Sequence, residues 1–128
     1  MSERGAVHLT LVALFFGSML MLGLAMDMAR FAGAWREAAH LAATAAETGA
    51  GWIDEEAARR DILMVDVAKA DDAARAVASG GTRRVEVNAT PDRVCVTVTI
   101  VVRPTLLTLA GAGPRSAAAT SCAEPRMG

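Results

Sequence analysis

An uncharged apolar run near the N-terminus constrains this chain more than any other feature. Residues 6–26 contain no charged side chain, and charges flank the run, with Arg4 before it and Asp27 after it. As a helix rising ~1.5 Å per residue, the run spans roughly 31 Å, which matches the hydrocarbon core of a bilayer. The sequence therefore predicts a transmembrane helix over residues 6–26, preceded by a short cytoplasmic leader of residues 1–5.

A cleaved signal peptide is the main alternative interpretation of this run. Gly23 and Ala25 are small residues at the spacing that a signal peptidase reads. The apolar run is longer than the usual ~7 to 15 residues of a signal core, however, and Glu3 balances the single Arg4 of the leader. A retained anchor is the favoured interpretation, and a buried helix of a soluble protein is the third.

Composition excludes several classes of function. The 128 residues carry 13 Lys and Arg against 14 Asp and Glu, so the chain has no basic field for a nucleic acid. No Walker loop, dinucleotide fingerprint or His/Cys cluster is present, which predicts a non-enzyme with no cofactor, no metal and no small-molecule substrate. The last aromatic residue is Trp52, so the remainder must build a thin core from small aliphatic side chains.

Beyond the membrane the same helix is expected to continue to about Thr48, where the segment 49–51, Gly-Ala-Gly, ends it. Apolar residues recur there at steps of three and four and taper from large side chains to alanine. This helix-packing seam consists of Met28, Phe31, Trp35, Ala38, Ala42 and Ala45. It predicts a helical stalk and turn over residues 27–52, packed either on the chain's own domain or against another subunit's helix.

Residues 53–128 are predicted to form a small extracytoplasmic helix-plus-sheet domain. Asp54 is a candidate N-cap for a second helix over Glu55–Ser79, which Gly80 and Gly81 would close. Alternating Val and Thr then predict three strands, over residues 84–90, 94–102 and 116–123, with a hairpin turn at 91–93. The fold class is therefore α+β: a long transmembrane helix with its stalk, then a second helix packed on a small, mainly antiparallel three-stranded sheet.

The two cysteines favour an oxidising compartment. Cys95 shares the more polar face of its strand with Thr97 and Thr99, and Cys122 lies on the more polar face of the last strand. If these strands are neighbours, both thiols lie on the outer face of one sheet, and a disulfide can form outside the cytoplasm. A disulfide in the region after the transmembrane helix places that region outside the cytoplasm and the N-terminus inside it. Two unpaired small hydrophobic residues remain the alternative.

Three segments, in this order, resemble a known family. They are Glu3-Arg4-Gly5-Ala6-Val7 before the apolar run, the alanine-rich stretch 37–46, and Val-Thr alternation followed by Arg-Pro-Thr-Leu-Leu at 103–107. Together they resemble the TadE/TadG-like proteins of the tight-adherence (Flp) pilus machinery. The resemblance implies a single-pass, pseudopilin-like protein of the bacterial cytoplasmic membrane that assists pilus assembly, with the bilayer and other pilus-assembly subunits as partners.

The resemblance also implies a processing site. Family members that a prepilin peptidase matures are cut after a glycine before the apolar run, which here is Gly5, leaving Ala6 as the new terminus. The fifth residue after the cut is commonly Glu in that pattern, and here it is Thr10. An unprocessed single-pass anchor is therefore the alternative to cleavage. A membrane-anchored extracytoplasmic binding module that is not part of a pilus is the second hypothesis for the function.

Overall fold

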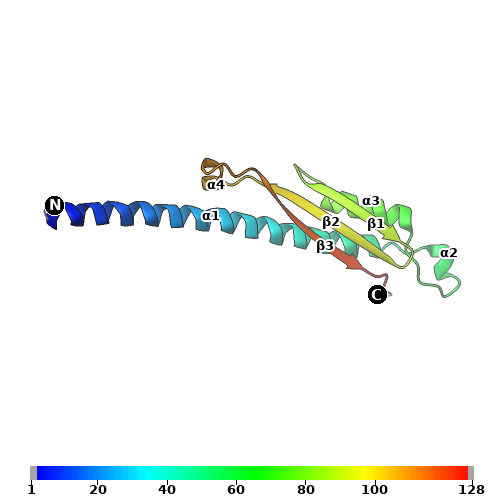
Figure 1. The fold of residues 1–128 in the computed structure, drawn as a ribbon. Coiled ribbons are helices and arrows are strands. Elements are labelled where there is room, and N and C mark those ends of the chain that lie inside the picture. The colour runs from blue at the N-terminus through cyan, green and yellow to red at the C-terminus, as the bar shows by residue number, and fades with distance from the viewer. Residues whose placement is uncertain (1–2, 127–128) are drawn as a thin grey trace.

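The computed structural model describes residues 3–126, with side-chain environments from residue 5 onward. Residues 1, 2, 127 and 128 lie outside the described part, so the predicted leader is described only in part. One long helix precedes a small three-stranded sheet, and three short helices complete the fold (Figure 1). The elements are α1 (Glu3–Ala50), α2 (Glu55–Ala58), α3 (Val67–Ala78), β1 (Arg84–Thr90), β2 (Arg93–Val102), α4 (Leu106–Leu109) and β3 (Arg115–Ala123). The predicted α+β class is confirmed.

Helix α1 is a single unbroken rod whose two halves have different surroundings. Its N-terminal half projects alone, and its C-terminal half lies against the sheet (Figure 1). The first proline of the chain is Pro91, so nothing in this stretch removes a backbone donor and kinks the helix. The helix ends where Trp52 N donates to Gly49 O at 3.1 Å, within two residues of the predicted end.

The sheet is antiparallel, with the strand order β1-β2-β3. A tight turn at Pro91 and Asp92 joins β1 to β2, which confirms the predicted hairpin. Helix α1 contacts β2 and β3, and α3 contacts β1, so the two helices cover the same face of the sheet. The opposite face, which carries Thr97 and Thr120, is open.

The hydrophobic core is built almost entirely from alanine and valine. The largest fully buried side chains of residues 5–126 are Val94, Val96 and Val98 of β2. Alanines of the two helices face them: Ala38, Ala42, Ala45, Ala46 and Ala50 from α1, and Ala70, Ala74 and Ala78 from α3. Side chains this small let the backbones approach closely: a Cβ on Gly49 would lie 3.0 Å from Val94 Cγ1. The core is thin, as predicted. Residues of the 27–52 segment supply a large part of it.

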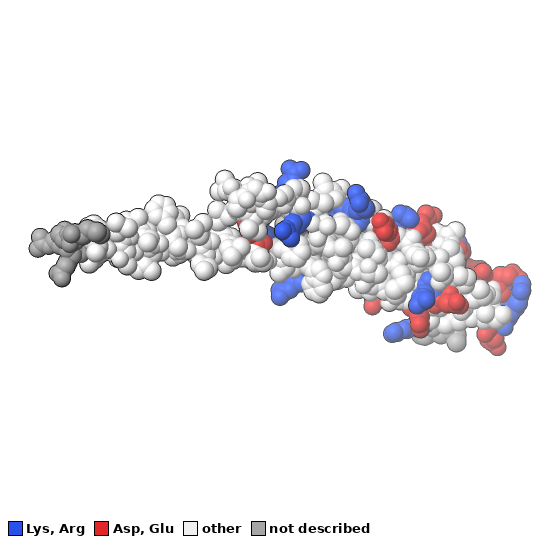
Figure 2. Space-filling view, in the orientation of Figure 1, with Lys and Arg blue, Asp and Glu red and all other residues white. Residues whose placement is uncertain are grey.

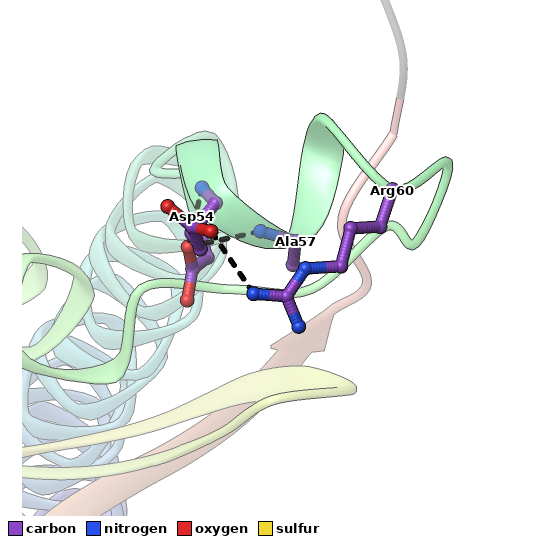
Figure 3. Close-up of polar contacts among 4 residues, drawn as sticks. Asp54, Ala57 and Arg60 are labelled. Atoms are coloured by element: carbon purple, nitrogen blue, oxygen red, sulfur yellow. Dashed lines mark hydrogen bonds and ion pairs between the residues drawn. The ribbon is translucent and has the colours of Figure 1, made fainter.

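The predicted single helix over Glu55–Ser79 is wrong, because the chain forms two helices there. Asp54 caps the first one as predicted, accepting from Glu56 N and Ala57 N, while Arg60 pairs with Glu56 (Figure 3). The helix then ends within two turns. Asp61 adopts the left-handed conformation, with φ of 59°, and its backbone N donates to Ala58 O at 3.1 Å. This is a Schellman-type end with aspartate in the position that glycine usually takes.

Long-range hydrogen bonds hold the connection between α2 and α3 extended. Val65 N donates to Pro91 O at 2.9 Å and Asp66 N donates to Trp52 O at 2.8 Å, so the hairpin turn and the end of α1 both bind this segment. Asp66 then accepts from Lys69 N at 3.2 Å and caps α3. Helix α3 ends at Ala78, just before the predicted glycine stop.

Candidate functional site

The N-terminal half of α1 is the first component of the candidate site. Over residues 5–26 its large apolar side chains point away from the rest of the protein, with Leu9 69% and Met21 72% exposed. The helix is long and apolar enough to cross a membrane. In the space-filling view, the part of this half that is not drawn in grey is a rod without Lys, Arg, Asp or Glu, whereas charges cover much of the sheet end (Figure 2).

Asp27 ends the bare half of α1 and binds a distant part of the chain. The residue is 5% exposed, and its carboxylate accepts hydrogen bonds from the backbone N atoms of Thr105, Leu106 and Leu107, at 2.9, 2.9 and 3.1 Å. The N–H groups at the start of a helix have no partners within that helix. Thr105 does not cap α4 with its own side chain. Asp27 therefore acts as the N-cap of α4 from another helix, an arrangement that we call the Asp27 clasp.

The clasp holds Asp27 in its ionised form. Hydrogen bonds from Thr105 N, and then from Leu107 N and Leu106 N, lower the pKa of the carboxyl group below its ordinary value. The charge of Arg30 acts in the same direction, and burial opposes it. The Arg30 guanidinium also donates to the Thr105 hydroxyl, so two side chains of α1 form hydrogen bonds with the same residue.

Gly23 provides the space for α4. A Cβ on Gly23 would lie 1.4 Å from Leu106 Cδ1 and 2.8 Å from Leu106 Cγ, so Leu106 lies directly over the glycine. Sequence reasoning missed this contact and the clasp, because it treated Asp27 only as a flanking charge and Gly23 only as a small residue. Because Thr105 is itself a residue type that is favoured at N-caps, the sequence carried no signal that another side chain caps α4.

The structure divides the predicted helix-packing seam into two parts. Ala38, Ala42 and Ala45 are fully buried against the chain's own sheet and α3. Phe31 and Trp35 remain 38% and 51% exposed, and Met28, in the same part of the seam, is also exposed. An apolar groove of about 330 Å³ lies between this part of α1, the end of β2 and α4, and its lining includes Met28, Phe31, Val102, Pro104 and Leu107. The large seam residues are thus available for contact with another molecule.

The predicted disulfide is present. Cys95 and Cys122 face each other directly across β2 and β3, with the Sγ atoms 2.09 Å apart and the Cα atoms 4.0 Å apart. Thr97 and Thr120 form the next pair on the same outer face, with their hydroxyl oxygens 2.8 Å apart. Alternation of side chains along the two strands placed both thiols on the more polar faces, and the pairing of β2 with β3 brings those faces together.

The predicted cleavage position lies at the opposite end of the molecule. Gly5 and Ala6 are in the first turns of α1 and exposed. Thr10 stands one turn further on, and its hydroxyl donates to Ala6 O at 2.9 Å. The Thr10 side chain is thus engaged within its own helix and carries no charge.

A second hollow, of about 530 Å³, lies at the far end of α1 beside the disulfide. Its charged lining residues are Glu47, Arg93, Glu124 and Arg126, which balance one another. Within residues 3–126, no group of His, Cys, Asp and Glu is arranged to hold a metal ion. The hollow therefore presents two acidic and two basic side chains to a molecule that enters it.

Comparisons with known proteins add no relative to this description. No protein-family model matches the chain, and searches of curated proteins and of solved structures gave no match. Function must therefore be argued from the bare helix, the clasp, the exposed seam residues and the disulfide.

Proposed function

We propose that this chain is a single-pass, pseudopilin-like envelope protein that assists assembly of a tight-adherence (Flp) type pilus or a related secretion apparatus. In this proposal the N-terminus lies in the cytoplasm, residues 6–26 cross the cytoplasmic membrane, and the sheet lies outside. The protein acts by contacts with other subunits rather than by catalysis.

One observation carries this proposal: a single unbroken helix has a bare apolar half and a half packed on a sheet. The resemblance in segments 3–7, 37–46 and 103–107 implies the same division into a lipid-inserted part and a displayed part. Because the helix continues without a break from Glu3 to Ala50, movement of the lipid-inserted half is transmitted directly to the sheet. A subunit that is moved or positioned within a membrane assembly requires such a rigid connection.

The exposed seam residues support contact with other subunits. Met28, Phe31 and Trp35 present large apolar side chains just beyond the predicted membrane boundary, beside the apolar groove. Exposed aromatic residues beside an apolar hollow are typical of protein contacts. The disulfide supports the extracytoplasmic placement, because such bonds persist in oxidising compartments.

Mass spectrometry of the mature N-terminus in native membranes tests the processing part of the proposal. We expect a chain beginning at Ala6, and Gly5→Leu as the matched variant should leave the leader in place. A chain beginning near Met26 would contradict the anchor itself, because the apolar run would then be a removed signal peptide.

Photo-crosslinking in cells tests the contact surface. A benzophenone amino acid at Phe31 should capture a pilus-assembly subunit, whereas the same probe at Asp72, which is exposed on α3, should not. Phe31→Ser should reduce piliation without reducing the amount of protein in the membrane. Equal capture from both positions would contradict a specific surface at the seam.

Thr10 favours a second candidate function. Threonine carries no charge that could pair with the new amine of a neighbouring subunit inside the membrane, and its hydroxyl donates to Ala6 O within its own helix. Two results together would support an anchored extracytoplasmic binding module instead. The chain would be unprocessed in native membranes, and cells that lack the protein would be piliated normally.

A further inference from the structure

The connection between β2 and β3 is an apolar loop whose start is bound to α1 and whose middle is exposed. Residues 104–114, here called the α4 loop, contain no charged residue, and Arg103 and Arg115 bound it. Leu109 is 83% exposed, the highest value among the large apolar side chains of residues 5–126. The middle of the loop thus presents apolar surface that the rest of the described chain does not cover.

The position of this loop along α1 indicates what surrounds it. Leu106 lies over Gly23, and the Asp27 clasp holds the start of α4 one turn further along the helix. Gly23 is ~6 Å nearer the N-terminus than Asp27 and belongs to the uncharged run of residues 6–26. Figure 1 shows the loop beside α1, reaching past the sheet toward the bare half.

We propose that the α4 loop enters the lipid interface, with Leu109 among the upper acyl chains, so that the protein contacts the membrane at two points. The inference rests on the proposed membrane anchor, because the bare half of α1 determines where the bilayer begins. An immersion depth of ~5–10 Å is typical of interfacial elements, and the overlap of the loop with residues 23–26 falls within it.

Immersion in lipid requires that the backbone N–H and C=O groups of the loop form hydrogen bonds within the protein rather than with water. Asp27 accepts from the first three N–H groups, at Thr105, Leu106 and Leu107. At the other end, Gly111 N donates to Thr108 O at 3.0 Å and Ala112 N donates to Leu107 O at 2.8 Å. The Thr108 hydroxyl donates to Pro104 O. The clasp thus gives three backbone N–H groups a partner within the protein, so these groups do not need water.

Charge at the base of the loop favours a lipid surface as the occupant. Arg103 and Arg115 are both exposed where the strands meet the loop, and Arg30 lies beside Thr105. In Figure 2, basic side chains gather where the uncharged rod meets the sheet end. Basic residues around an apolar tip match anionic headgroups above acyl chains. A protein partner would need a separate apolar surface, whereas the bilayer is already adjacent to the loop.

Depth-dependent fluorescence quenching tests the proposal with the full chain. Trp35→Phe and Trp52→Phe provide a background in which a single tryptophan is placed at Leu109. The protein is reconstituted into vesicles of phosphatidylcholine and phosphatidylglycerol, with bromine near the top of the phosphatidylcholine acyl chains in one preparation, which reports on residue 109, and near the chain ends in another, which reports on the middle of the span. Since Leu109 is exposed, Leu109→Trp disturbs no packing. We expect its emission to fall by about half in brominated vesicles, as for an interfacial residue.

Two further single-tryptophan proteins make the outcome decisive. Phe15→Trp reports on the anchor, and native Trp52, retained alone, reports on the far end of α1. Quenching at 15 and 109 but not at 52 is the expected pattern. Quenching at 15 alone overturns the inference and leaves the anchor intact. Absence of quenching at 15 overturns the proposed anchor, and the inference with it.

Discussion

The two halves of α1 share one backbone geometry and differ in what covers them. The half before Asp27 carries Leu, Phe and Met side chains that nothing in the described chain covers, whereas the half from Ala38 to Ala50 packs alanines against valines of the sheet. Lipid chains adapt to large and irregular side chains, but a sheet and a helix must fit each other closely. If the bare half is the proposed anchor, side-chain size along a single helix marks where lipid packing ends and protein packing begins.

This difference predicts that the halves fail in different ways. The alanine half derives its stability from a thin core and close approach of the backbones. A small increase in side-chain volume, or loss of the disulfide, should therefore destabilise the sheet end. The bare half contributes little to that core. Changes there should alter membrane insertion while leaving the folded sheet end intact.

The largest expected effect comes from the disulfide, which compensates for the thin core. Replacing Cys95 and Cys122 with Ser should lower the free energy of unfolding by ~3.5 kcal/mol. The bond closes a loop across a sequence separation of 27 residues and so lowers the conformational entropy of the unfolded chain, which regains that entropy when the bond is removed. Chemical denaturation of the full chain in detergent micelles measures this. The reduced wild type is the control and should unfold with the double variant. A double variant as stable as the oxidised protein would mean that the core does not need the bond.

The next effect should appear only in the bare half. Leu14→Arg places a charge near the middle of residues 6–26 and should weaken insertion by ~3 kcal/mol. Membrane fractionation should show loss from the membrane, while Leu14→Ala remains there. The Cys95–Cys122 bond should still form in any chain that is exported. Unchanged membrane retention of the arginine variant would show that the bare half does not cross the bilayer.

Matched alanine substitutions test the comparison within the same helix. Ala42→Leu inserts volume between α1 and the sheet, where Ala42 is fully buried, and should cost ~2 kcal/mol of stability. Ala13→Leu adds the same atoms on the exposed half and should leave stability unchanged. Denaturation midpoints of the two variants give the measurement. Equal destabilisation of both would show that the two halves are not energetically distinct.

Much of the fold could be predicted from local pattern. The absence of proline before Pro91 and the glycines at 49 and 51 indicated the extent of α1, and alternation along the last two strands placed Cys95 and Cys122 on the more polar faces. Each of these depends on neighbouring residues along the chain. They were therefore visible before any tertiary contact was known.

The features that sequence reasoning missed depend on contacts between distant residues. The break between α2 and α3 arises where Val65 binds Pro91 and Asp61 takes a left-handed conformation, which periodicity does not reveal. Asp27 binds α4 from 78 to 80 residues away. Likewise, the spacing of Phe31 and Ala38 showed that they share a helix face, but not that the sheet covers only Ala38.

Two glycines of α1 provide a finer test of close approach. A Cβ on Gly33 would meet nothing within 4 Å, so Gly33→Ala should stabilise the helix by ~1 kcal/mol. A Cβ on Gly49 would lie 3.0 Å from Val94 Cγ1 and 3.1 Å from Ala70 O, and this crowding should cancel the gain. Denaturation midpoints should rise for Gly33→Ala and stay level or fall for Gly49→Ala. A rise for both would mean that the sheet is packed more loosely on α1.

The smallest expected effect is local and lies at the boundary between the halves. Because the clasp lowers the pKa of Asp27 in the folded protein, its stabilisation of α4 is fully present above the ordinary pKa of 3.8 and is lost as the pH falls from there through the lowered value. The amide protons of Thr105, Leu106 and Leu107 should therefore keep their NMR chemical shifts from neutral pH down to about that ordinary value. They should move upfield together only below it, as the carboxylate gains a proton and the three hydrogen bonds weaken. Asp27→Asn removes the titrating group and should abolish the transition, while amides in β2 stay unchanged in both proteins. A transition above the ordinary pKa would mean that burial outweighs the three backbone donors, and α4 would then be held to α1 by Leu106 over Gly23 rather than by charge.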